Sequence, residues 1–266
     1  MKTSADLIAF VSRLGGRRGV ERSVKVSRGQ VLADRCLASI ELATLGDAPL
    51  ARLVELAREL EMPQDFIDAL PEVIKGADNL HFGFEGAPEG DVRKVYLEYA
   101  SSARRAMVSA LPESTLVHVA FKWSPGRPSS RAIARYTRNP CATLAEIQAR
   151  IGEIAPPAAA PIAFSLVQKI LARMTFLEHA RDLMVLAVEE SGNPRRSFDL
   201  NLYEARLRLA HINDLLVATL REYGAPIDAG RQIFEANADA WAGHVAGGVG
   251  RSGDEFATIY FDGKWT

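Results

Sequence analysis

Residues that could carry chemistry recur at matched places along the chain. Three histidines lie at equivalent positions of short alternating runs: His81, His118 and His244. Runs after the turn-rich segments carry four tyrosines: Tyr96, Tyr136, Tyr203 and Tyr260. Imidazoles exchange protons near neutral pH or bind metals, and phenols donate and accept hydrogen bonds. This repetition therefore predicts a shared ligand site.

Charged and polar side chains accompany these rings. Glu85 lies four residues after the first histidine, and it is with His81 the candidate catalytic residue. The candidate substrate-binding residues alternate along the same runs: Lys94, Tyr96, His118, Lys122, Tyr136, Asn201, Tyr203, His244, Thr258 and Tyr260. Lysines suit an anionic substrate group.

Several roles stay open for the repeated rings. Three imidazoles would suit zinc or iron, but equivalent strands of neighbouring hairpins lie about 10 Å apart. The histidines could therefore meet only across a narrow barrel, and no metal ligands are assigned. Contact with substrate, acid–base work and structural hydrogen bonding are the other roles. The tyrosines either surround a ligand or fill the interior of the fold.

Alternation places these residues on β-hairpins. Successive side chains of a strand point to opposite faces. The apolar face is expected to hold these residues: Leu80, Phe82, Phe84, Val95, Leu97, Val117, Val119, Phe121, Trp123, Met184, Leu186, Val188, Phe198, Leu200, Leu202, Val245, Ala257, Ile259 and Phe261. The polar face holds the candidate residues above, with Glu98, Asp199 and Asp262. Val185, Ala187 and Glu189 are also expected there.

Helical periodicity separates the hairpins. Helices are expected over these ranges: 3–14, 29–45, 50–61, 64–75, 99–111, 142–154, 162–178, 204–223 and 228–241. Val24 and Val26 alternate, so a short strand is compatible with that segment. Gly247-Gly248-Val249-Gly250 lies between two strands and opens no helix, so a bulge or close backbone approach is favoured over a phosphate loop.

The pattern predicts an α+β fold with four repeated β-hairpins separated by helices. An antiparallel sheet closed or nearly closed into a barrel, with helices outside, would turn the polar face into a lumen. An open curved sheet is the alternative. Residues 1–75 are expected to form an N-terminal helical segment that packs on an αββ-repeat barrel over 76–266, as one continuous domain.

Bulk composition narrows the class of protein. The 266 residues carry a formal net charge of −1, so no global field favours nucleic acid or an acidic membrane. The two cysteines, Cys36 and Cys141, form no disulfide framework and no metal-ligand spacing. The start resembles no signal peptide, and no stretch of about 18 apolar residues occurs. A cytoplasmic protein is expected.

The repeats resemble the ABBA aromatic prenyltransferases, which are antiparallel barrels of αββα units with a polar lumen. Lys94-Val95-Tyr96 is similar to the Lys-x-Tyr that the family carries on second strands to hold the prenyl diphosphate. The resemblance covers about residues 76–266 and implies that Glu85 holds the aromatic acceptor. Departures are Ala134, Asn201 and Thr258 at the other lysine positions, and four hairpins where the family has five.

The resemblance implies a biosynthetic enzyme that transfers a prenyl group to an aromatic acceptor. Two alternatives stay open: a non-catalytic binding protein of a biosynthetic or maturation complex, and a metal oxygenase ligated by histidines. The expected partner is a small-molecule substrate, and a protein partner is left open. No resident cofactor is expected beyond Mg²⁺ accompanying a diphosphate donor.

Overall fold

The computed structural model describes residues 1–88, 90–108, 113–174 and 183–265. They group into two compact units, each described here by itself. Unit 1 comprises Met1–Arg22, Asp34–Tyr136 and Lys264–Thr266, and unit 2 comprises Ser23–Ala33 and Thr137–Gly263. The sequence-based division at residue 75 stays a prediction, and these two units do not coincide with it.

Unit 1 combines antiparallel strands with four helices. Its strands are β1 (Arg18–Ser27), β3 (Arg35–Glu41), β4 (Asn79–Glu85), β5 (Val92–Glu98), β6 (Thr115–Ser124) and β7 (Arg127–Asn139). Its helices are α1 (Ser4–Ser12), α2 (Pro49–Glu59), α3 (Gln64–Val73) and α4 (Ala100–Val108). The strands pair in the order β1-β3-β4-β5-β6-β7, and the last residues of β1 and β7 belong to unit 2.

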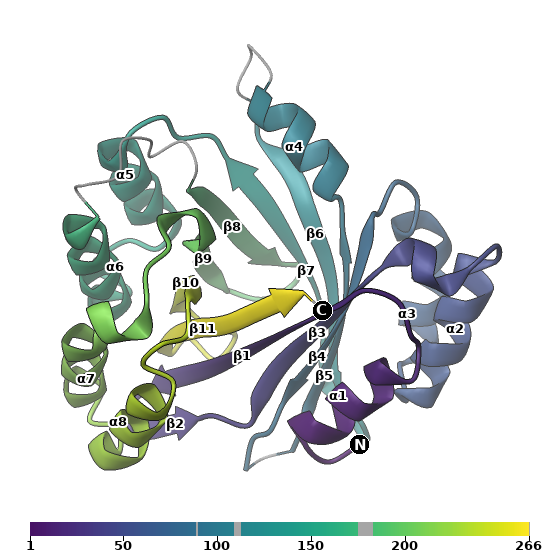
Figure 1. Cartoon of the computed structure of the whole chain (residues 1–266), viewed down its shortest axis with the longest axis horizontal. Helices are drawn as coiled ribbons and strands as arrows, with labels where there is room; N and C mark the ends of the chain where they lie inside the picture. The colour runs from purple at the N-terminus through teal and green to yellow at the C-terminus, as the bar shows by residue number, and fades with distance from the viewer. Residues whose placement is uncertain (89, 109–112, 175–182, 266) are drawn as a thin grey trace. The chain divides into compact units, whose positions relative to one another are not determined.

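Alternation along the strands of unit 1 builds its core. Phe82 and Phe121 are fully buried on the side of the sheet that α1, α2 and α3 cover (Figure 1). Leu53 of α2 and Phe66 of α3 belong to the same apolar cluster. A capping box at Thr3 begins α1 by satisfying the first free backbone amides of the helix. The opposite side of β3–β6 is called the polar face below.

Unit 2 repeats the arrangement with its own core. Its strands are β2 (Gln30–Leu32), β8 (Met184–Glu190), β9 (Arg196–Asn201), β10 (Ala242–Val249) and β11 (Glu255–Trp265), the last two residues of which belong to unit 1. Its helices are α5 (Leu144–Ile154), α6 (Pro161–Arg173), α7 (Asn213–Glu222) and α8 (Ile227–Ala236), which follow one another along the sheet (Figure 1). Phe198 and Ile259 pack against Ile170 of α6 in one apolar cluster.

The hydrogen-bonded strand order has no open end at β1 or β11. Strands β8 to β11 continue the order from β7, and β11 pairs with β1. Within the described residues, strand β2 pairs with β1 alone and stands outside this circuit. The described part of the chain therefore has the pairing of a closed antiparallel barrel, with helices on the apolar face, which confirms the predicted fold class.

The segment 29–45 was expected to be helical, and this expectation is wrong. It forms β2, β3 and the short 3-10 helix η1 (Leu42–Leu45). Cys36, Ala38 and Ile40 are buried at a period of two, which is the period of a strand. Strands β1 and β3 pair antiparallel and supply a fifth hairpin. Residues 1–75 therefore contain strands β1, β2 and β3 as well as helices.

The expected helix 204–223 is shorter in the structure. Only α7 is α-helical there, and two 3-10 helices precede it, η3 (Tyr203–Ala205) and η4 (Leu209–His211). Arg206 adopts a left-handed conformation at the end of η3, which interrupts a continuous helix. Residues 109–111 and 175–178, at the ends of two other expected helices, lie outside the described part of the chain.

The faces of β8 are the reverse of those predicted. Val185 lies opposite Leu200, and Leu186 lies opposite Asp199. Directly paired residues share a face, so Val185 joins the core while Leu186 lies on the polar side. Met184 and Val188 follow Leu186, and Glu189 is exposed on the other side. The six consecutive apolar residues Leu183–Val188 have no alternation from which the face could be assigned.

The glycines of β10 permit close contact, as the sequence favoured. A Cβ on Gly247 would lie 2.7 Å from the Cβ of Ala163 in α6. Gly248 has φ +132°, and a Cβ there would lie 2.3 Å from the carbonyl oxygen of Arg196.

None of the helices among the described residues has the length and apolar character that a membrane crossing requires.

Candidate functional site

Three neighbouring strands bring predicted residues together on the polar face of unit 1. Lys94 of β5 lies directly opposite Lys122 of β6. His81 of β4 lies directly opposite Tyr96. Glu98 lies opposite His118. Period-two alternation puts these side chains away from the apolar core, so the face has a cationic end and an end rich in imidazole.

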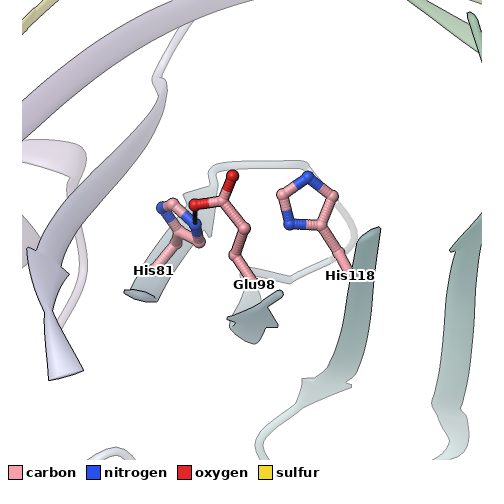
Figure 2. A group of neighbouring side chains, drawn as sticks. All are labelled: His81, Glu98 and His118. Carbon is pink, nitrogen blue, oxygen red and sulfur yellow. Dashed lines mark hydrogen bonds and ion pairs between the residues drawn. The ribbon is translucent and has the colours of Figure 1, made fainter. Parts of the chain in front are cut away.

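The imidazole end is a compact cluster of two histidines around one carboxylate. His81 Nε2 lies 3.1 Å from Glu98 Oε2, and Glu98 lies between the rings of His81 and His118 (Figure 2). One ligand atom of each residue lies within 4.8 Å of the others. Ser39 Oγ is 2.6 Å from His81 Nδ1, and the Asn79 side-chain amide donates to Glu98 Oε2 at 2.7 Å.

Glu98 is a strongly acidic carboxyl in this setting. Burial raises its pKa, but the hydrogen bond from His81 opposes that effect. Charge interactions with His81 and His118 and the hydrogen bond from Asn79 add to it, and together they lower the pKa of Glu98 to about 2. The cluster therefore holds an ionised carboxylate at neutral pH.

Both ring nitrogens of His81 are engaged. A carboxylate accepts hydrogen bonds, so the pairing with Glu98 assigns a proton to Nε2, and Nδ1 shares a hydrogen bond with the Ser39 hydroxyl. His81 was predicted to act in acid–base catalysis, and that role stays a prediction. Its contacts support an orienting role for the Glu98 carboxylate.

Aromatic rings continue from this cluster toward β7. His118 lies 5.6 Å from Tyr136 and 6.4 Å from Tyr96, measured between ring centroids. Tyr96 and Tyr136 are 5.8 Å apart, and Tyr136 also lies 5.6 Å from Lys122 Nζ. Phenol faces stabilise nearby positive charge, so this group can stabilise a cation.

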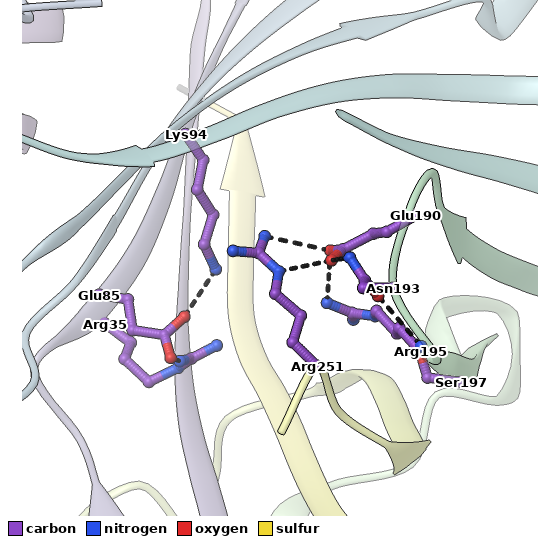
Figure 3. A network of polar contacts seen from close by, with 8 residues as sticks. All are labelled: Arg35, Glu85, Lys94, Glu190, Asn193, Arg195, Ser197 and Arg251. Atoms are coloured by element: carbon purple, nitrogen blue, oxygen red, sulfur yellow. Dashed lines mark hydrogen bonds and ion pairs between the residues drawn. The ribbon is translucent and has the colours of Figure 1, made fainter. Parts of the chain in front are cut away.

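The cationic end of the polar face contains three basic side chains and one carboxylate. Glu85 accepts a hydrogen bond from Lys94 Nζ at 2.8 Å and lies 2.5 Å from a guanidinium nitrogen of Arg35 (Figure 3). Lys122 is 3% exposed. The predicted role of Glu85, to hold an aromatic acceptor, stays a prediction. In the structure its carboxylate contacts two cationic side chains, Arg35 and Lys94.

Unit 2 holds the remaining predicted residues around His244. Its Nδ1 lies 2.7 Å from Asp199 Oδ1, and its ring lies 5.4 Å from Tyr203 and 5.8 Å from Tyr260. Thr258 lies directly opposite Ala246, one alternation along the same face. His244 therefore pairs with a carboxylate of its own, whereas His81 and His118 share Glu98.

Asn201 has a local structural contact in unit 2. Its side-chain oxygen accepts a hydrogen bond from the backbone amide of Tyr203 at 3.0 Å. Asn201 also lies directly opposite His244. Substrate contacts of Asn201, Tyr203, His244, Thr258 and Tyr260 stay predictions.

A second ionic group of unit 2 surrounds a buried carboxylate. Glu190 accepts hydrogen bonds from Arg195 at 2.9 Å and from Arg251 at 2.5 Å (Figure 3). Asn193 contributes a third donor to Glu190, and Arg195 also donates to Ser197. The sequence provided no reason to single out this group, because the reversed faces of β8 hid the polar placement of Glu190.

An open pocket of about 470 Å³ lies beside the imidazole cluster in unit 1. Asn79 lines the pocket and donates to Glu98, so one side chain joins the two. Asp78 and Arg104 also line it. The cluster is therefore one residue removed from a solvent-accessible hollow.

Three further residues of unit 1 join the site. The sequence placed Glu98 on the polar face, two residues after Tyr96, but Glu98 was not among the candidate site residues. Ser39 and Arg35 lie on β3, where a helix was expected, so their faces could not be assigned.

Comparison with solved structures shows which proteins share this fold. The prenyltransferase PriB, in a complex with L-tryptophan and dimethylallyl thiolodiphosphate, matches with TM-score 0.62 and 17% identity, over 91% of this chain and 79% of that chain. The 6-dimethylallyltryptophan synthase of Micromonospora olivasterospora matches with TM-score 0.59 and 15% identity, over 91% and 81%. The chain has the fold of the ABBA aromatic prenyltransferases.

NotF in complex with brevianamide F also shares this ABBA fold, with TM-score 0.58 and 12% identity over 92% of this chain and 80% of that chain. No protein-family model matches the sequence, and no curated protein matches it significantly. The resemblance noted from the repeats is therefore confirmed at the level of the fold.

Proposed function

We propose that this protein transfers a prenyl group from a diphosphate donor to an aromatic acceptor. The observation that carries the proposal is the direct opposition of Lys94 and Lys122 on the polar face, beside the phenols of Tyr96 and Tyr136. The shared fold supports it, because structures with that fold were solved with tryptophan and a dimethylallyl diphosphate analogue.

The cationic end suits the donor. At this end of the face Arg35, Lys94 and Lys122 carry three positive charges and Glu85 one negative charge, so these four side chains sum to a formal charge of +2. Like charges directly opposite on neighbouring strands are unfavourable, and a bound diphosphate relieves their repulsion. Mg²⁺ accompanying the donor stays a prediction.

The imidazole end suits the acceptor. Glu98 follows Lys94 by four residues on β5, which is about 13 Å along a strand. This span matches a short prenyl donor placed end to end with an aromatic ring. The ionised carboxylate of Glu98 is an acceptor for a polar hydrogen of that ring.

The proposed reaction breaks the bond between the allylic carbon and the diphosphate oxygen, and the diphosphate leaves with the electron pair. Tyr96 and Tyr136 stabilise the allylic cation through their ring faces. A ring carbon of the acceptor then donates two electrons to form the new carbon–carbon bond. The ring proton passes to Glu98, and the low pKa of this carboxyl suffices because the protonated ring is a far stronger acid.

Turnover by purified protein tests the proposal. Dimethylallyl diphosphate is supplied with indole or phenol acceptors, and product is followed by mass spectrometry. Glu98→Gln is expected to lower kcat by about 10²–10⁴, the range for a lost proton acceptor. Glu189→Gln removes an exposed carboxylate of β8 and is the matched control, which is expected to keep full activity.

Two results would count against the proposal. Absence of product across donors and acceptors would do so, as would equal activity of Glu98→Gln and the unmodified protein. Ligand binding without turnover would favour a non-catalytic binding protein with this fold.

A further inference from the structure

We infer that His81, Glu98 and His118 form a binding site for a divalent transition-metal ion of the zinc class. Two imidazoles and one carboxylate lie on the adjacent strands β4, β5 and β6. One ligand atom from each lies within 4.8 Å of the other two. Two nitrogen ligands and one oxygen ligand make a set that zinc uses where a further coordination position stays open.

The donor spacing is close to that of a formed site. Ligand atoms about 2.1 Å from a tetrahedral zinc ion lie about 3.4 Å apart. His81 Nε2 and Glu98 Oε2 are 3.1 Å apart, so two of the three ligand atoms lie close to this separation. His118 approaches the same carboxylate from the other side (Figure 2). Its ligand atom lies within 4.8 Å of the other two, so the ring has to move closer to complete the set.

The residues around the three ligands orient them as metal sites require. Metal-bound imidazoles usually hydrogen-bond through their other nitrogen, and ligating carboxylates are hydrogen-bonded in turn. Ser39 Oγ lies 2.6 Å from His81 Nδ1 and can accept a hydrogen bond from it in the other tautomer, in which Nε2 has no proton and can bind the metal. Asn79 donates to Glu98 at 2.7 Å, so the carboxylate is hydrogen-bonded as well.

The types of ligand determine which metal ions the site favours. Imidazole suits zinc, copper, iron and nickel, whereas magnesium prefers oxygen ligands and retains its waters. The site therefore differs from the Mg²⁺ considered with a diphosphate donor. It also differs from a set of three histidines, because Glu98 takes the third place and His244 pairs with Asp199 in unit 2.

Metal binding bears on the proposed transfer, and this one consequence rests on that proposed function. A bound ion occupies the Glu98 carboxylate, which would otherwise take the acceptor proton. The zinc-loaded protein is therefore expected to be inactive in prenyl transfer. Metal titration needs no substrate, so a failure of either idea is distinguishable from a failure of the other.

The test is titration of the full chain after removal of metal with a chelator. Zn²⁺ binding is measured by calorimetry, and Co²⁺ binding by its visible absorption, which reports nitrogen ligation. One equivalent is expected, with no comparable heat from Mg²⁺. His118→Ala and Glu98→Gln are each expected to weaken Zn²⁺ affinity at least 100-fold. Ser39→Ala is expected to weaken it about 10-fold, because it acts through His81.

His244→Ala is the matched control, since it removes a histidine that also pairs with a carboxylate. Its metal affinity is expected to equal that of the unmodified chain. Circular dichroism melts show that each variant is folded, and His118→Gln replaces His118→Ala if the latter is not. Absence of a one-to-one Zn²⁺ complex overturns the inference. Equal affinity in folded His118 variants, or equal loss in His244→Ala, overturns it as well.

Discussion

Lys94 and Lys122 face each other directly across β5 and β6, on the side of the sheet away from the core. Lys122 is almost fully buried, and Lys94 is tied to Glu85. Like charges directly opposite each other on neighbouring strands are unfavourable, so this pairing is expected to cost stability in the free protein. The same pair of lysines can bind an anion. Their effect on stability and their effect on anion affinity can therefore be measured separately.

Lys122→Met should separate the two effects. Removal of one ammonium is expected to raise the free energy of unfolding by up to about 1 kcal/mol, because the cross-strand repulsion is lost. Affinity for inorganic pyrophosphate is expected to fall about 10-fold or more, because a charge-assisted hydrogen bond is lost. Urea unfolding and calorimetric titration measure the two quantities.

Lys75→Met serves as the control for that comparison, since Lys75 is exposed and pairs only with Glu72 at the end of α3 among the contacts described. Neither quantity should change in it by more than a small amount. Loss of stability together with unchanged pyrophosphate affinity in Lys122→Met would show that Lys122 is a packing residue.

Asp199→Asn is expected to change the tautomer of His244. The carboxylate accepts from Nδ1, so the proton of the neutral ring lies there. An asparagine amide can donate instead, which favours the tautomer protonated at Nε2. Nitrogen chemical shifts of the imidazole report the change, and the signals of His211 are the internal reference. Unchanged His244 shifts would contradict the pairing.

Gly248→Ala is expected to destabilise the protein by about 2 kcal/mol or more. Its φ of +132° is unfavourable for any L side chain, and the new methyl group would lie 2.3 Å from the Arg196 carbonyl oxygen. Gly250→Ala is the matched control, because its nearest neighbour would be 3.5 Å away. Thermal melts that give equal stability for the two variants would rule out the close approach.

Cys36 should react slowly with iodoacetamide. Burial first, and the charge of Asp34 second, raise the pKa of its thiol to about 12, so little thiolate exists at pH 8.5. Cys141 is less buried and should be modified first. Mass spectrometry of Cys141→Ser should show almost no label under native conditions and one label in urea. Rapid native labelling of that variant would place Cys36 near the surface.

The same thiol has a consequence for stability in alkali. The unfolded chain ionises Cys36 near pH 9, while the folded chain keeps the thiol neutral up to about pH 12. The unfolded state therefore binds fewer protons across this window, and the free energy of unfolding falls as pH rises through it. Cys36→Ala should show a smaller decrease between pH 9 and 11 in urea unfolding.

The sequence predicted hairpin faces well wherever polar and apolar residues alternate. Leu80, Phe82 and Phe84 join the core as expected, and His81 lies on the other face with Glu85. Alternation failed over Met184–Val188, where every residue is apolar. The face there depends on register with β9, and register is set by partners distant in the sequence.

The first hairpin shows a second limit. Apolar residues crowd the segment 29–45 so densely that both helical and strand periods match it, and only pairing with β1 and β4 selects the strand. Ser39 and Arg35 could not be assigned to the site for this reason. Cross-strand contacts such as Glu98 with His81 likewise depend on register rather than on local sequence.

Strands β1, β7 and β11 each contribute residues to both compact units. Neither unit is therefore one uninterrupted length of polypeptide, and a gene fragment that encodes residues 34–136 lacks the β1 strand that pairs with β3. Separate expression of the two halves would expose unpaired strand edges, which promote aggregation. Gene fusions are thus better made at the termini than within the chain. We expect neither compact unit to fold when it is expressed without the other.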